Sequence, residues 1–377
     1  MIAPARRMLL GLALCLPALA AWSQGVTPRT VVLGQSAPLT GPLQPLGEEM
    51  RNGALAYLRK LNDAGGVHGR RLELATLDDG GEPARSLANT RRFIEEYRVF
   101  ALLAYPEPSL TREVLATVQQ ARIPLFGAAT GAASARRPGR GVFSVRASRA
   151  DEAEQVVSHY ALLGLKRFAL VRKDDAAGAE FLAGARNALS ARGPAPLADI
   201  VLLDDAAGLA GAARDAFMAD PQVVVVALAQ PPAADLIREI RRGGSGAQIV
   251  ALSTSDPDAL AKALGPGGTG IALSQVVPPL AQVSLPIVSE YRAALAAETG
   301  RTAHDPRSLE AYIAAKVFAE SVRRAGPGLS REALWRALDA MSFYDAGGYG
   351  VAFSRNRRQG STRVYLMAIG QDGKLLH

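Results

Sequence analysis

Residues that could perform catalysis are few in this 377-residue chain, and none is arranged in a familiar catalytic pattern. The single cysteine, Cys15, lies near the amino terminus, and no G-x-S-x-G sequence marks a serine nucleophile. The glycine-rich stretch 265–270 precedes a predicted strand rather than joining a strand to a helix, so it is a poor phosphate cradle. The histidines lack the H-x-x-x-H and H-E-x-x-H spacings that hold zinc: His68, His159, His304 and His377. These residues predict neither an enzyme nor a metal site.

Two adjacent carboxylates, Asp78 and Asp79, follow a predicted strand and could be taken for a cation site. Hard cations require several oxygen ligands at a fixed spacing. Here two glycines follow instead, and Glu82 opens the next predicted helix. Since carboxylates are favoured at the amino ends of helices, we expect helix capping and solvation for this pair, and no metal.

Hydroxyl-bearing and small residues follow two other predicted strands, and their chemistry suits contact with a ligand. Ser109 and Thr111 open a helix after the loop that contains Tyr105, and Ala129 and Thr130 lie in a glycine-flanked turn. Hydroxyl groups and the positive end of a helix stabilise a carboxylate, and small residues let the backbone approach a ligand. Each residue also has a local alternative. Ser109 is equally suited to cap its helix, and the Thr130 hydroxyl is suited to bond the backbone of its own turn. Tyr105 would either form an aromatic wall of the site or pack under the loop.

The composition is that of an ordinary globular protein with a moderate basic excess. Apolar residues make up 49 % of the chain and charged residues 21 %, and 43 Lys and Arg outnumber 35 Asp and Glu, for a net charge of +8. The densest basic cluster, Arg136, Arg137 and Arg140, lies in a Gly/Pro loop without the aromatic residues that a nucleic-acid stacking platform needs. We expect no nucleic-acid partner and a solvated loop here, although a positive field would favour an anionic ligand or an acidic partner surface.

The first two dozen residues have the features of a cleaved secretory signal. Two arginines precede the apolar run 8–21, and small residues follow it. A membrane anchor needs about 20 apolar residues, whereas this run is shorter and contains Pro17. We therefore predict a signal peptide at 1–23, ordinary rather than twin-arginine export, and a periplasmic mature protein. Cys15 lies inside this segment and outside a lipidation pattern, so the mature chain would have neither thiol nor disulfide.

Strand and helix patterns alternate along most of the chain, which predicts an α/β fold with parallel sheets. Near-continuous apolar runs such as Val223–Leu228 are typical of strands buried on both faces. About 300 residues of alternation exceed one core, so we expect two doubly wound lobes with a ligand site at the carboxyl ends of their strands. The predicted strands are 30–34, 71–77, 99–104, 124–126, 167–172, 223–228, 248–252 and 270–274, and the clearest helices are 46–62 and 82–96.

Two stretches resemble the amino-terminal lobe of periplasmic leucine/isoleucine/valine-type substrate-binding proteins of ABC transporters: LTGPLQPLGEEMRNG at 39–53 and LNDAGGVHGRRLELATLDDGGEPARSLANTRRFIEE at 61–96. The resemblance implies two lobes joined by three crossover segments, here 139–147, 275–285 and 345–353, that close like a hinge around a ligand. The implied lobes are 24–145 plus 277–345 and 146–276 plus 346–377.

The same resemblance implies ligand contacts on both lobes. In the first lobe, the turns that contain Ser109 and Thr130 match those that hold a ligand carboxylate. In the second lobe, Asp256 corresponds to the carboxylate that pairs with a ligand ammonium group, although Asp before Pro also starts ordinary turns. Ala177 stands where amino-acid binders have a tyrosine. The predicted contacts are Leu39, Tyr105, Ser109, Thr111, Ala129, Thr130, Asp174, Gln230 and Asp256.

These features predict a monomeric, cofactor-free receptor that captures an amino acid or similar small carboxylate and delivers it to an ABC transporter permease. The alanine at 177 leaves room for a larger or differently shaped ligand. Two alternatives stay open: a sensory module of the same fold that reports to a regulator or kinase, and an α/β enzyme, which would need a nucleophile or base that the sequence does not reveal.

Overall fold

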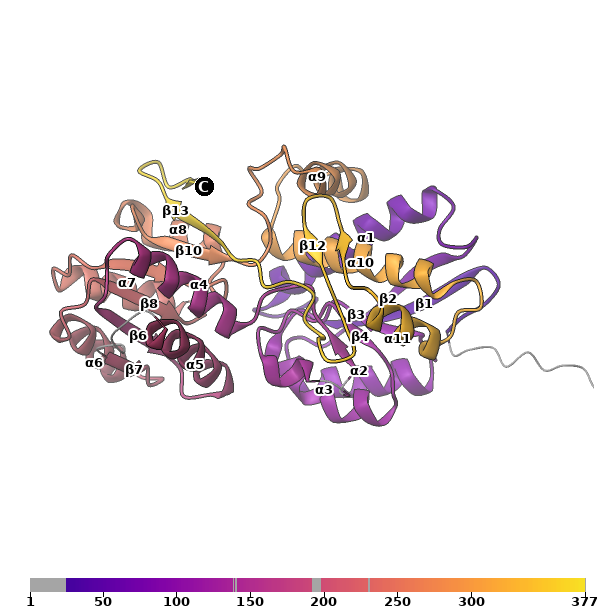
Figure 1. The fold of residues 1–377 in the computed structure, drawn as a ribbon, viewed down its shortest axis with the longest axis horizontal. Coiled ribbons are helices and arrows are strands. Elements are labelled where there is room, and N and C mark those ends of the chain that lie inside the picture. Colours follow the sequence, from indigo (N-terminus) through magenta and orange to yellow (C-terminus); the bar gives the residue numbers. More distant parts are fainter. Residues whose placement is uncertain (1–24, 138, 140, 192–197, 230, 377) are drawn as a thin grey trace, which may run out of the picture.

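The chain forms two α/β lobes, each built on its own mainly parallel sheet (Figure 1). The computed structural model describes residues 25–376 apart from 138, 140, 192–197 and 230, so the predicted signal peptide lies outside the described residues. The carboxyl terminus lies on the lobe formed by the middle of the sequence (Figure 1). Among the described residues, no helix is both long and apolar enough to span a bilayer. The predicted fold class is confirmed.

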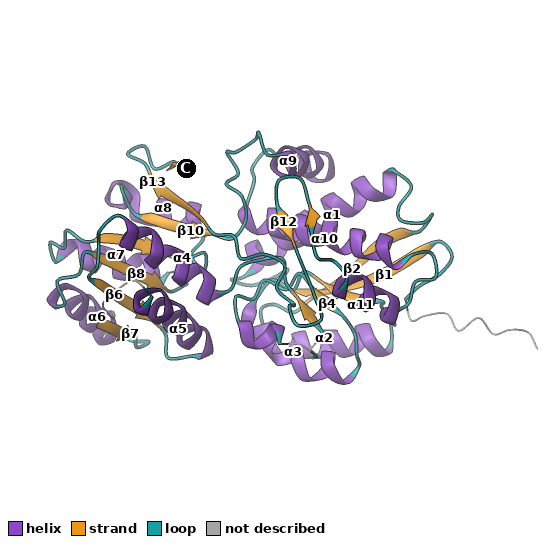
Figure 2. Cartoon of the chain, in the orientation of Figure 1, coloured by secondary structure: helices purple, strands orange, loops and turns teal. Residues whose placement is uncertain are grey.

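The first lobe has a five-stranded parallel sheet in the order β2-β1-β3-β4-β5. β1 pairs with β2 along its whole length, from Thr30 opposite Arg71 to Ala37 opposite Asp78. All residues of β3, β4 and β5 are buried, because helices cover both faces of the sheet (Figure 2). The strands are β1 (Thr30–Ala37), β2 (Arg71–Asp78), β3 (Ala101–Leu103), β4 (Leu125–Phe126) and β5 (Val142–Phe143).

The second lobe repeats this order in the parallel set β7-β6-β8-β9-β10, and two antiparallel strands extend its edge beyond β10. The parallel strands are β6 (Phe168–Arg172), β7 (Ala198–Val201), β8 (Val223–Ala227), β9 (Gln248–Ala251) and β10 (Ala272–Gln275), and the antiparallel strands are β13 (Tyr365–Ile369) and β14 (Leu375–Leu376). β7 was not predicted, because this edge strand buries a single residue and therefore has a weak apolar pattern. With this strand order, ligands bind at the carboxyl ends of the strands, where the winding direction reverses.

The helices of the first lobe come from two distant parts of the sequence, and α10 packs along α1 (Figure 1). They are α1 (Gln44–Asp63), α2 (Pro83–Glu95), α3 (Pro108–Gln120), α9 (Pro286–Thr299), α10 (Pro306–Ala325) and α11 (Arg331–Asp339), with the short 3₁₀ helix η1 (Ala133–Arg136) and the hairpin of β11 (Tyr344–Asp345) and β12 (Gly350–Val351). The second lobe contains α4 (Arg149–Leu162), α5 (Ala176–Ser190), α6 (Ala206–Met218), α7 (Pro232–Arg242), α8 (Pro257–Leu264) and the 3₁₀ helix η2 (Gly265–Gly268).

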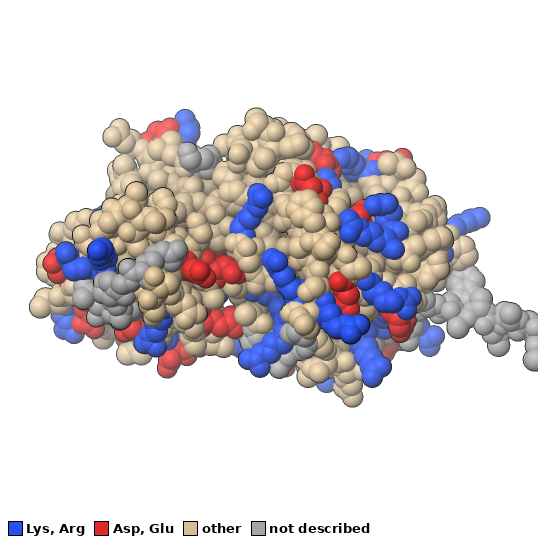
Figure 3. Space-filling view, viewed as in Figure 1, with Lys and Arg blue, Asp and Glu red and all other residues tan. Residues whose placement is uncertain are grey.

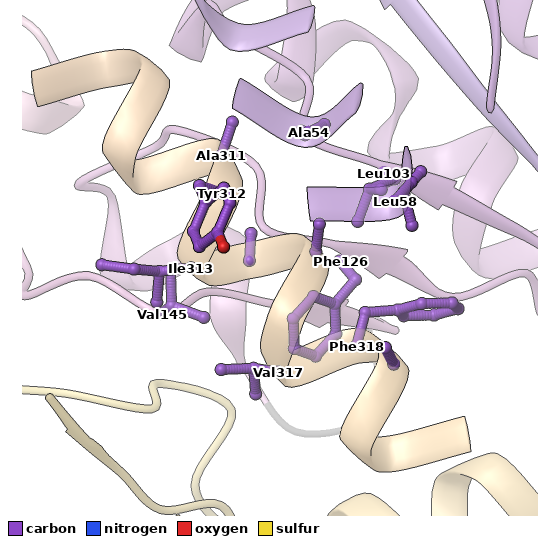
Figure 4. Close-up of a cluster of buried hydrophobic side chains, with 14 of the residues drawn as sticks. Ala54, Leu58, Leu103, Phe126, Val145, Ala311, Tyr312, Ile313, Val317 and Phe318 are labelled. Atoms are coloured by element: carbon purple, nitrogen blue, oxygen red, sulfur yellow. The ribbon is translucent and has the colours of Figure 1, made fainter. Parts of the chain in front are cut away.

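The core of the first lobe is centred on α10, which is buried along most of its length. Phe318 of α10 packs edge-on against Phe126 of β4, with ring centroids 5.6 Å apart, and Leu103 and Val145 belong to the same cluster (Figure 4). Full burial of one such side chain contributes about 1.5–3 kcal/mol. Because α10 contacts both α1 and the sheet residues, the returning segment of the chain is an integral part of this lobe.

Three neighbouring segments connect the lobes. The Tyr349 hydroxyl donates toward the carbonyls of Val145 and Val276, at 2.8 and 3.0 Å, and so ties the first crossing segment to the second. Ser144 forms a parallel bridge with Gln359, which joins the first segment to the third. Any hinge motion of the lobes must bend this bundle.

Side-chain packing bears on where the third crossing lies. The sequence-based division starts the tail of the second lobe at residue 346. However, Ala346, Tyr349 and Phe353 pack in the core of the first lobe, with the Phe353 ring 5.8 Å from that of Phe126. We therefore propose that the first lobe extends to about Phe353, while the divisions near 145 and 276 stay predictions.

Candidate functional site

Loops from the carboxyl ends of both sheets meet between the lobes, and we call this region the interlobe junction. Ser253, which follows β9, accepts a hydrogen bond of 2.8 Å from Arg146 in the first crossing segment. Asp256, at the start of α8, forms an ion pair of 2.7 Å with Arg307 near the start of α10. This is the edge at which α/β sheets bind their ligands.

Three arginines and two glutamates are buried together in the interlobe junction. Arg146 lies between Glu310 of α10 and Glu152 of α4, with N–O distances of 3.4 and 3.8 Å. Arg149 is 4.0 Å from the same oxygen of Glu152, and Arg136 donates to two backbone carbonyls beside them. All five residues are at most 7 % exposed. The junction is therefore a charged cluster rather than an apolar seam.

The hydrogen bonds in this cluster are unevenly satisfied. Glu152 accepts from the amide and hydroxyl of Ser253 and from the Ser274 hydroxyl, at 3.0, 2.8 and 2.8 Å. In contrast, Nε of Arg146 and Nη1 of Arg149 have no hydrogen-bond partner among the described atoms. An unsatisfied buried donor costs about 1–3 kcal/mol, so these groups are candidates for ligand contact.

Burial dominates the electrostatics of the cluster. Burial raises the pKa of Glu310, although Arg146 acts in the opposite direction. Burial also lowers the pKa of Arg149 despite Glu152, and burial together with Arg146 lowers the pKa of Arg136 to about 10. The charge on these arginines is incompletely compensated, so an anion beside them would be stabilised.

The first predicted carboxylate turn is organised by Glu107, which the sequence analysis did not single out. The Glu107 carboxylate caps α3 by accepting from the amides of Ser109 and Leu110, at 2.6 and 3.0 Å, and from the Ser109 hydroxyl. The capping role considered for Ser109 is therefore wrong, because Pro108 occupies the first helical position and moves the cap back by two residues. Thr111 is fully buried and donates to the Glu107 carbonyl at 3.1 Å. Ligand contacts by these two hydroxyls stay predictions.

The second predicted carboxylate turn lies against the arginine cluster. The Thr130 hydroxyl accepts from the Ala132 amide at 3.2 Å, which is the local role considered as its alternative. The Ala129 amide donates to the Tyr105 carbonyl at 2.9 Å, and the Ala129 carbonyl lies 3.5 Å from Nη1 of Arg146. This predicted ligand segment is in direct contact with the charged cluster.

Tyr105 and Leu39 have structural partners in the first lobe. The Tyr105 side chain is fully buried under the loop, with its hydroxyl 2.9 Å from that of Thr90, so the aromatic-wall interpretation loses its support. Leu39 is half-buried, and its amide donates to Asp78 at 2.7 Å.

Asp78 and Asp79 fasten the loop after β1 and do not cap α2. Asp78 accepts from the Thr40 hydroxyl and two backbone amides. Asp79 is fully buried and accepts from the Ser36 hydroxyl at 2.7 Å. The cap position of α2 is Glu82, which makes no side-chain cap bond, so the expected capping is wrong. The expected solvation is wrong for Asp79, whereas Asp78 is partly exposed. In the ranges that the structure describes, no three His, Cys, Asp or Glu side chains are grouped as metal ligands.

The remaining second-lobe predictions are only partly placed. Asp174 is exposed and pairs with Arg172 at 3.6 Å, whereas its neighbour Asp175 caps α5 through the Gly178 amide at 2.7 Å. Gln230 lies outside the described residues.

Asp256 has two partners at the start of α8. One carboxylate oxygen accepts from the Ala259 amide at 2.7 Å, which is a helix-capping role. The other is 2.7 Å from Nη2 of Arg307, which also pairs with Asp305, the cap of α10. A ligand ammonium group at Asp256 would have to compete with Arg307.

The arginine–glutamate cluster was not predicted, because its members come from a crossing segment and from helices of both lobes. Arg136 was expected in a solvated loop, and this is wrong: it is 4 % exposed, since η1 folds against the crossing segment. A usable signal was present in Arg146 and Arg149, two arginines three residues apart at the end of an apolar strand-like passage.

Two surface hollows lie away from the interlobe junction. One of about 600 Å³ is lined by the end of α3 and by Gly139, and one of about 310 Å³ is lined by Arg238 and Arg241 of α7 with Leu264. On the face shown in Figure 3, basic and acidic side chains are interspersed. Each hollow is lined by residues of one lobe, so neither lies where the loops of the two sheets meet.

Two α/β lobes of identical strand order, joined by three crossings, define the class of two-lobed binding proteins. The sequence profile of the periplasmic binding protein family matches residues 30–374, and the chain belongs to this family.

Solved structures similar to this chain cover nearly all of it. A substrate-binding periplasmic protein from Ralstonia solanacearum is 30 % identical with a TM-score of 0.80, over 92 % of this chain and 99 % of that one. An extracellular ligand-binding receptor from Verminephrobacter eiseniae is 28 % identical with a TM-score of 0.83, over 92 % and 100 %. A possible leucine/isoleucine/valine-binding protein from Rhodopirellula baltica is 27 % identical with a TM-score of 0.80, over 93 % and 97 %.

Curated relatives match over a much shorter stretch. The Leu/Ile/Val-binding protein BraC3 of Rhizobium johnstonii is 33 % identical over 64 residues, and the leucine-, isoleucine-, valine-, threonine-, and alanine-binding protein of Pseudomonas aeruginosa is 33 % identical over 67 residues. These matches span 17 % and 18 % of the length of the relatives and the same shares of this chain.

Proposed function

We propose that this protein is an extracytoplasmic solute receptor that captures a small organic acid between its lobes and delivers it to an ABC transporter permease. The observation that carries the proposal is the meeting of carboxyl-end loops from two sheets of the same strand order around a buried charged cluster. Membership of the periplasmic binding protein family supports binding rather than catalysis. The names of the relatives support an amino acid or a similar carboxylate as cargo.

The proposed receptor is monomeric, free of cofactors and periplasmic after loss of residues 1–23. Its ligand contacts include the turns of Ser109 and Thr130 in the first lobe. The Ser109 hydroxyl already donates to Glu107, so a contact with the carboxylate exchanges that hydrogen bond. The Thr130 hydroxyl accepts within its turn and can still donate its proton to the carboxylate.

Closure of the lobes is a population shift in this proposal. Moving the ratio of closed to open molecules from 1:99 to 99:1 takes about 5.5 kcal/mol of differential binding. A ligand with micromolar affinity has about 8.2 kcal/mol of binding free energy, so contacts to both lobes can supply this difference. A ligand that contacted only one lobe would bind without closing the protein.

The test combines ligand screening with solution scattering. The midpoint of thermal unfolding is measured against amino acids, aliphatic and aromatic carboxylates, amides and sugars, since a ligand that binds only the folded state raises it. Any stabilising compound is then added to saturation in small-angle X-ray scattering. The proposal expects a smaller radius of gyration and recovery of the compound chemically unchanged. An unaltered radius at saturation contradicts lobe closure, and a converted compound contradicts the receptor role.

A further inference from the structure

We propose that the ligand is an organic anion without an ammonium group, and that Arg149 and Arg146 hold its anionic group beside the turn 127–131. This inference rests on the proposed function and specifies the ligand chemistry of the same junction.

The three buried arginines converge on this turn. Nη2 of Arg136 donates to the Gly131 carbonyl at 3.0 Å, and Nη1 of Arg146 lies 3.5 Å from the Ala129 carbonyl. The Arg149 amide donates to the Gly131 carbonyl at 3.0 Å. A Cβ atom on Gly131 would lie 3.0 Å from Cγ of Arg149, so the glycine lets this side chain approach the turn closely. The turn predicted to hold a carboxylate is therefore bordered by guanidinium groups.

Hydrogen-bond donors outnumber acceptors among the unsatisfied charged groups of the junction. Nε of Arg136, Nε of Arg146 and Nη1 of Arg149 lack hydrogen-bond partners among the described atoms, and each of these residues is at least nine-tenths buried. Among the carboxylates of the cluster, the corresponding acceptor is Oε1 of Glu310. Hydrogen bonds between guanidinium and carboxylate are about twice as strong as neutral ones, so an anionic ligand satisfies this surplus best.

Other carboxylates at the junction are already engaged. Glu152 accepts from two serine hydroxyls, and Asp256 accepts from a helix amide and pairs with Arg307. Glu180 accepts from the Ala133 amide at 2.6 Å, and Asp175 caps α5. An ammonium group would therefore have to displace one of these partners and pay its desolvation without a new acceptor.

Glu310 is the one competing acceptor in the cluster. Its Oε2 lies 3.4 Å from Nη1 of Arg146, so an ammonium group on Oε1 would sit close to that guanidinium and be repelled by it. Glu310 is therefore the residue whose contacts decide whether the site binds a simple anion or a zwitterion.

The experiment compares ligands of matched shape and charge on the purified protein by isothermal titration calorimetry. Leucine and 4-methylpentanoate share a carbon skeleton but differ in the ammonium group, and glutarate adds a second carboxylate. We expect binding of 4-methylpentanoate or glutarate and at least tenfold weaker binding of leucine. Arg149→Gln should weaken anion binding by about 10- to 100-fold, and Arg149→Lys should weaken it less, because it keeps the charge but loses the planar fork.

The matched control is Arg167→Gln, an exposed arginine of the second lobe that pairs with Asp220, and its affinity should equal that of the parent protein. Thermal unfolding without ligand verifies that each variant is folded. Glu310→Gln should bind the anion more tightly, since it removes a competing carboxylate from Arg146.

Several results overturn the inference while leaving the proposed function intact: tight binding of leucine with lobe closure, abolition of that binding by Glu310→Gln, or unchanged affinity in both Arg149 variants. If no acid or amino acid binds or compacts the protein, the proposed function fails and the inference fails with it.

Discussion

Tyr105 and Thr90 share a hydrogen bond of 2.9 Å in the core under the loop after β3. The Thr90 hydroxyl also lies 2.8 Å from the Ser86 carbonyl, which can only accept, so Tyr105 is the donor to Thr90. At the residue scale, this hydrogen bond assigns Tyr105 a structural role in the core rather than a contact with the ligand.

Replacement of Tyr105 by Phe tests that assignment. We expect the free energy of unfolding to fall by about 1 kcal/mol, because a buried donor is lost while the ring still fills its place. Ligand affinity should be unchanged. Denaturant titration and calorimetry measure the two quantities, and Tyr97→Phe, on a partly exposed ring, is the control. A loss of affinity without loss of stability would show that the Tyr105 hydroxyl contacts the ligand and would contradict its structural role.

Asp78 offers a second test at the residue scale. Burial opposes its ionisation, but the Thr40 hydroxyl, the amides of Leu39 and Gly80, and Arg85 together hold its pKa at about 2. An unfolded aspartate has a pKa of about 3.9. Asp78 therefore contributes stability above about pH 4, and this contribution is lost as the pH falls toward 2.

We expect Asp78→Asn to lower the free energy of unfolding by about 1 kcal/mol at pH 7, a value kept modest because the carboxylate is partly open to solvent. The difference from the parent protein should shrink as the pH falls from 4 to 2. Direct comparison of the two proteins is needed, because burial raises the pKa of the neighbouring Asp79. Asp174→Asn, at an exposed site, is the control, and a difference independent of pH would contradict the assignment.

At the scale of elements, β4 and α10 approach each other at Gly127. This residue has a φ of 69°, and a Cβ atom there would lie 2.4 Å from Cβ of Ala314. The turn that leads to Ala129 and Thr130 is therefore held against α10 by the absence of a side chain.

Gly127→Ala should destabilise the protein by about 2–4 kcal/mol, because backbone strain and overpacking add. Gly300→Ala is the matched control: its φ is 70°, but no atom lies within 4 Å of the added methyl group. It should cost about 1 kcal/mol from backbone strain alone. Equal losses in the two variants, measured by denaturant titration, would contradict the close packing of β4 on α10.

Helices and strands were predicted correctly from the sequence where their apolar pattern extends over many residues. Helix 46–62 was predicted and α1 spans Gln44–Asp63, because apolar residues recur on one face over five turns. β7 was missed because an edge strand needs little apolar surface. The cap of α3 was misplaced because Glu107 reaches the helix amides from before a proline, a geometry that residue type alone does not specify.

At the scale of the molecule, Arg307 links the start of α10 in the first lobe to Asp256 at the start of α8 in the second. The pair is partly buried, with side chains 31 % and 19 % exposed. Such a pair favours the conformation in which the lobes are in contact.

Arg307→Ala should shift the ratio of closed to open molecules by about fivefold, or about 1 kcal/mol. The expected result is a proportionate loss of ligand affinity, and a larger radius of gyration than that of the parent protein at a ligand concentration that closes half of the parent molecules. Arg323→Ala is the control, since Arg323 lies at the far end of α10 and pairs with Glu320 within the same helix. If both variants behave alike in solution scattering, the pair does not control closure.

The parts of the candidate site that depend on local sequence were predicted, and the parts that depend on residues far apart in the sequence were not. The turn of Ala129 and Thr130 was predicted from small and hydroxyl residues after a strand, and the structure sets it against Arg146. Arg146 and Glu310 were not predicted, because they are 164 residues apart in sequence and meet only when α10 returns to the first lobe. Their ionic contact depends on that return.

The sequence by itself determined the α/β alternation, the two sheets and the loops at their carboxyl ends, since these depend on apolar periodicity and turn residues within short stretches. Only the tertiary structure decided which hydroxyls bond inside their own turns, which carboxylates fasten loops, and which arginines are buried between the lobes. The physical reason is that burial and pairing of polar groups depend on neighbours that are remote in the chain, and these neighbours are set by packing rather than by local pattern.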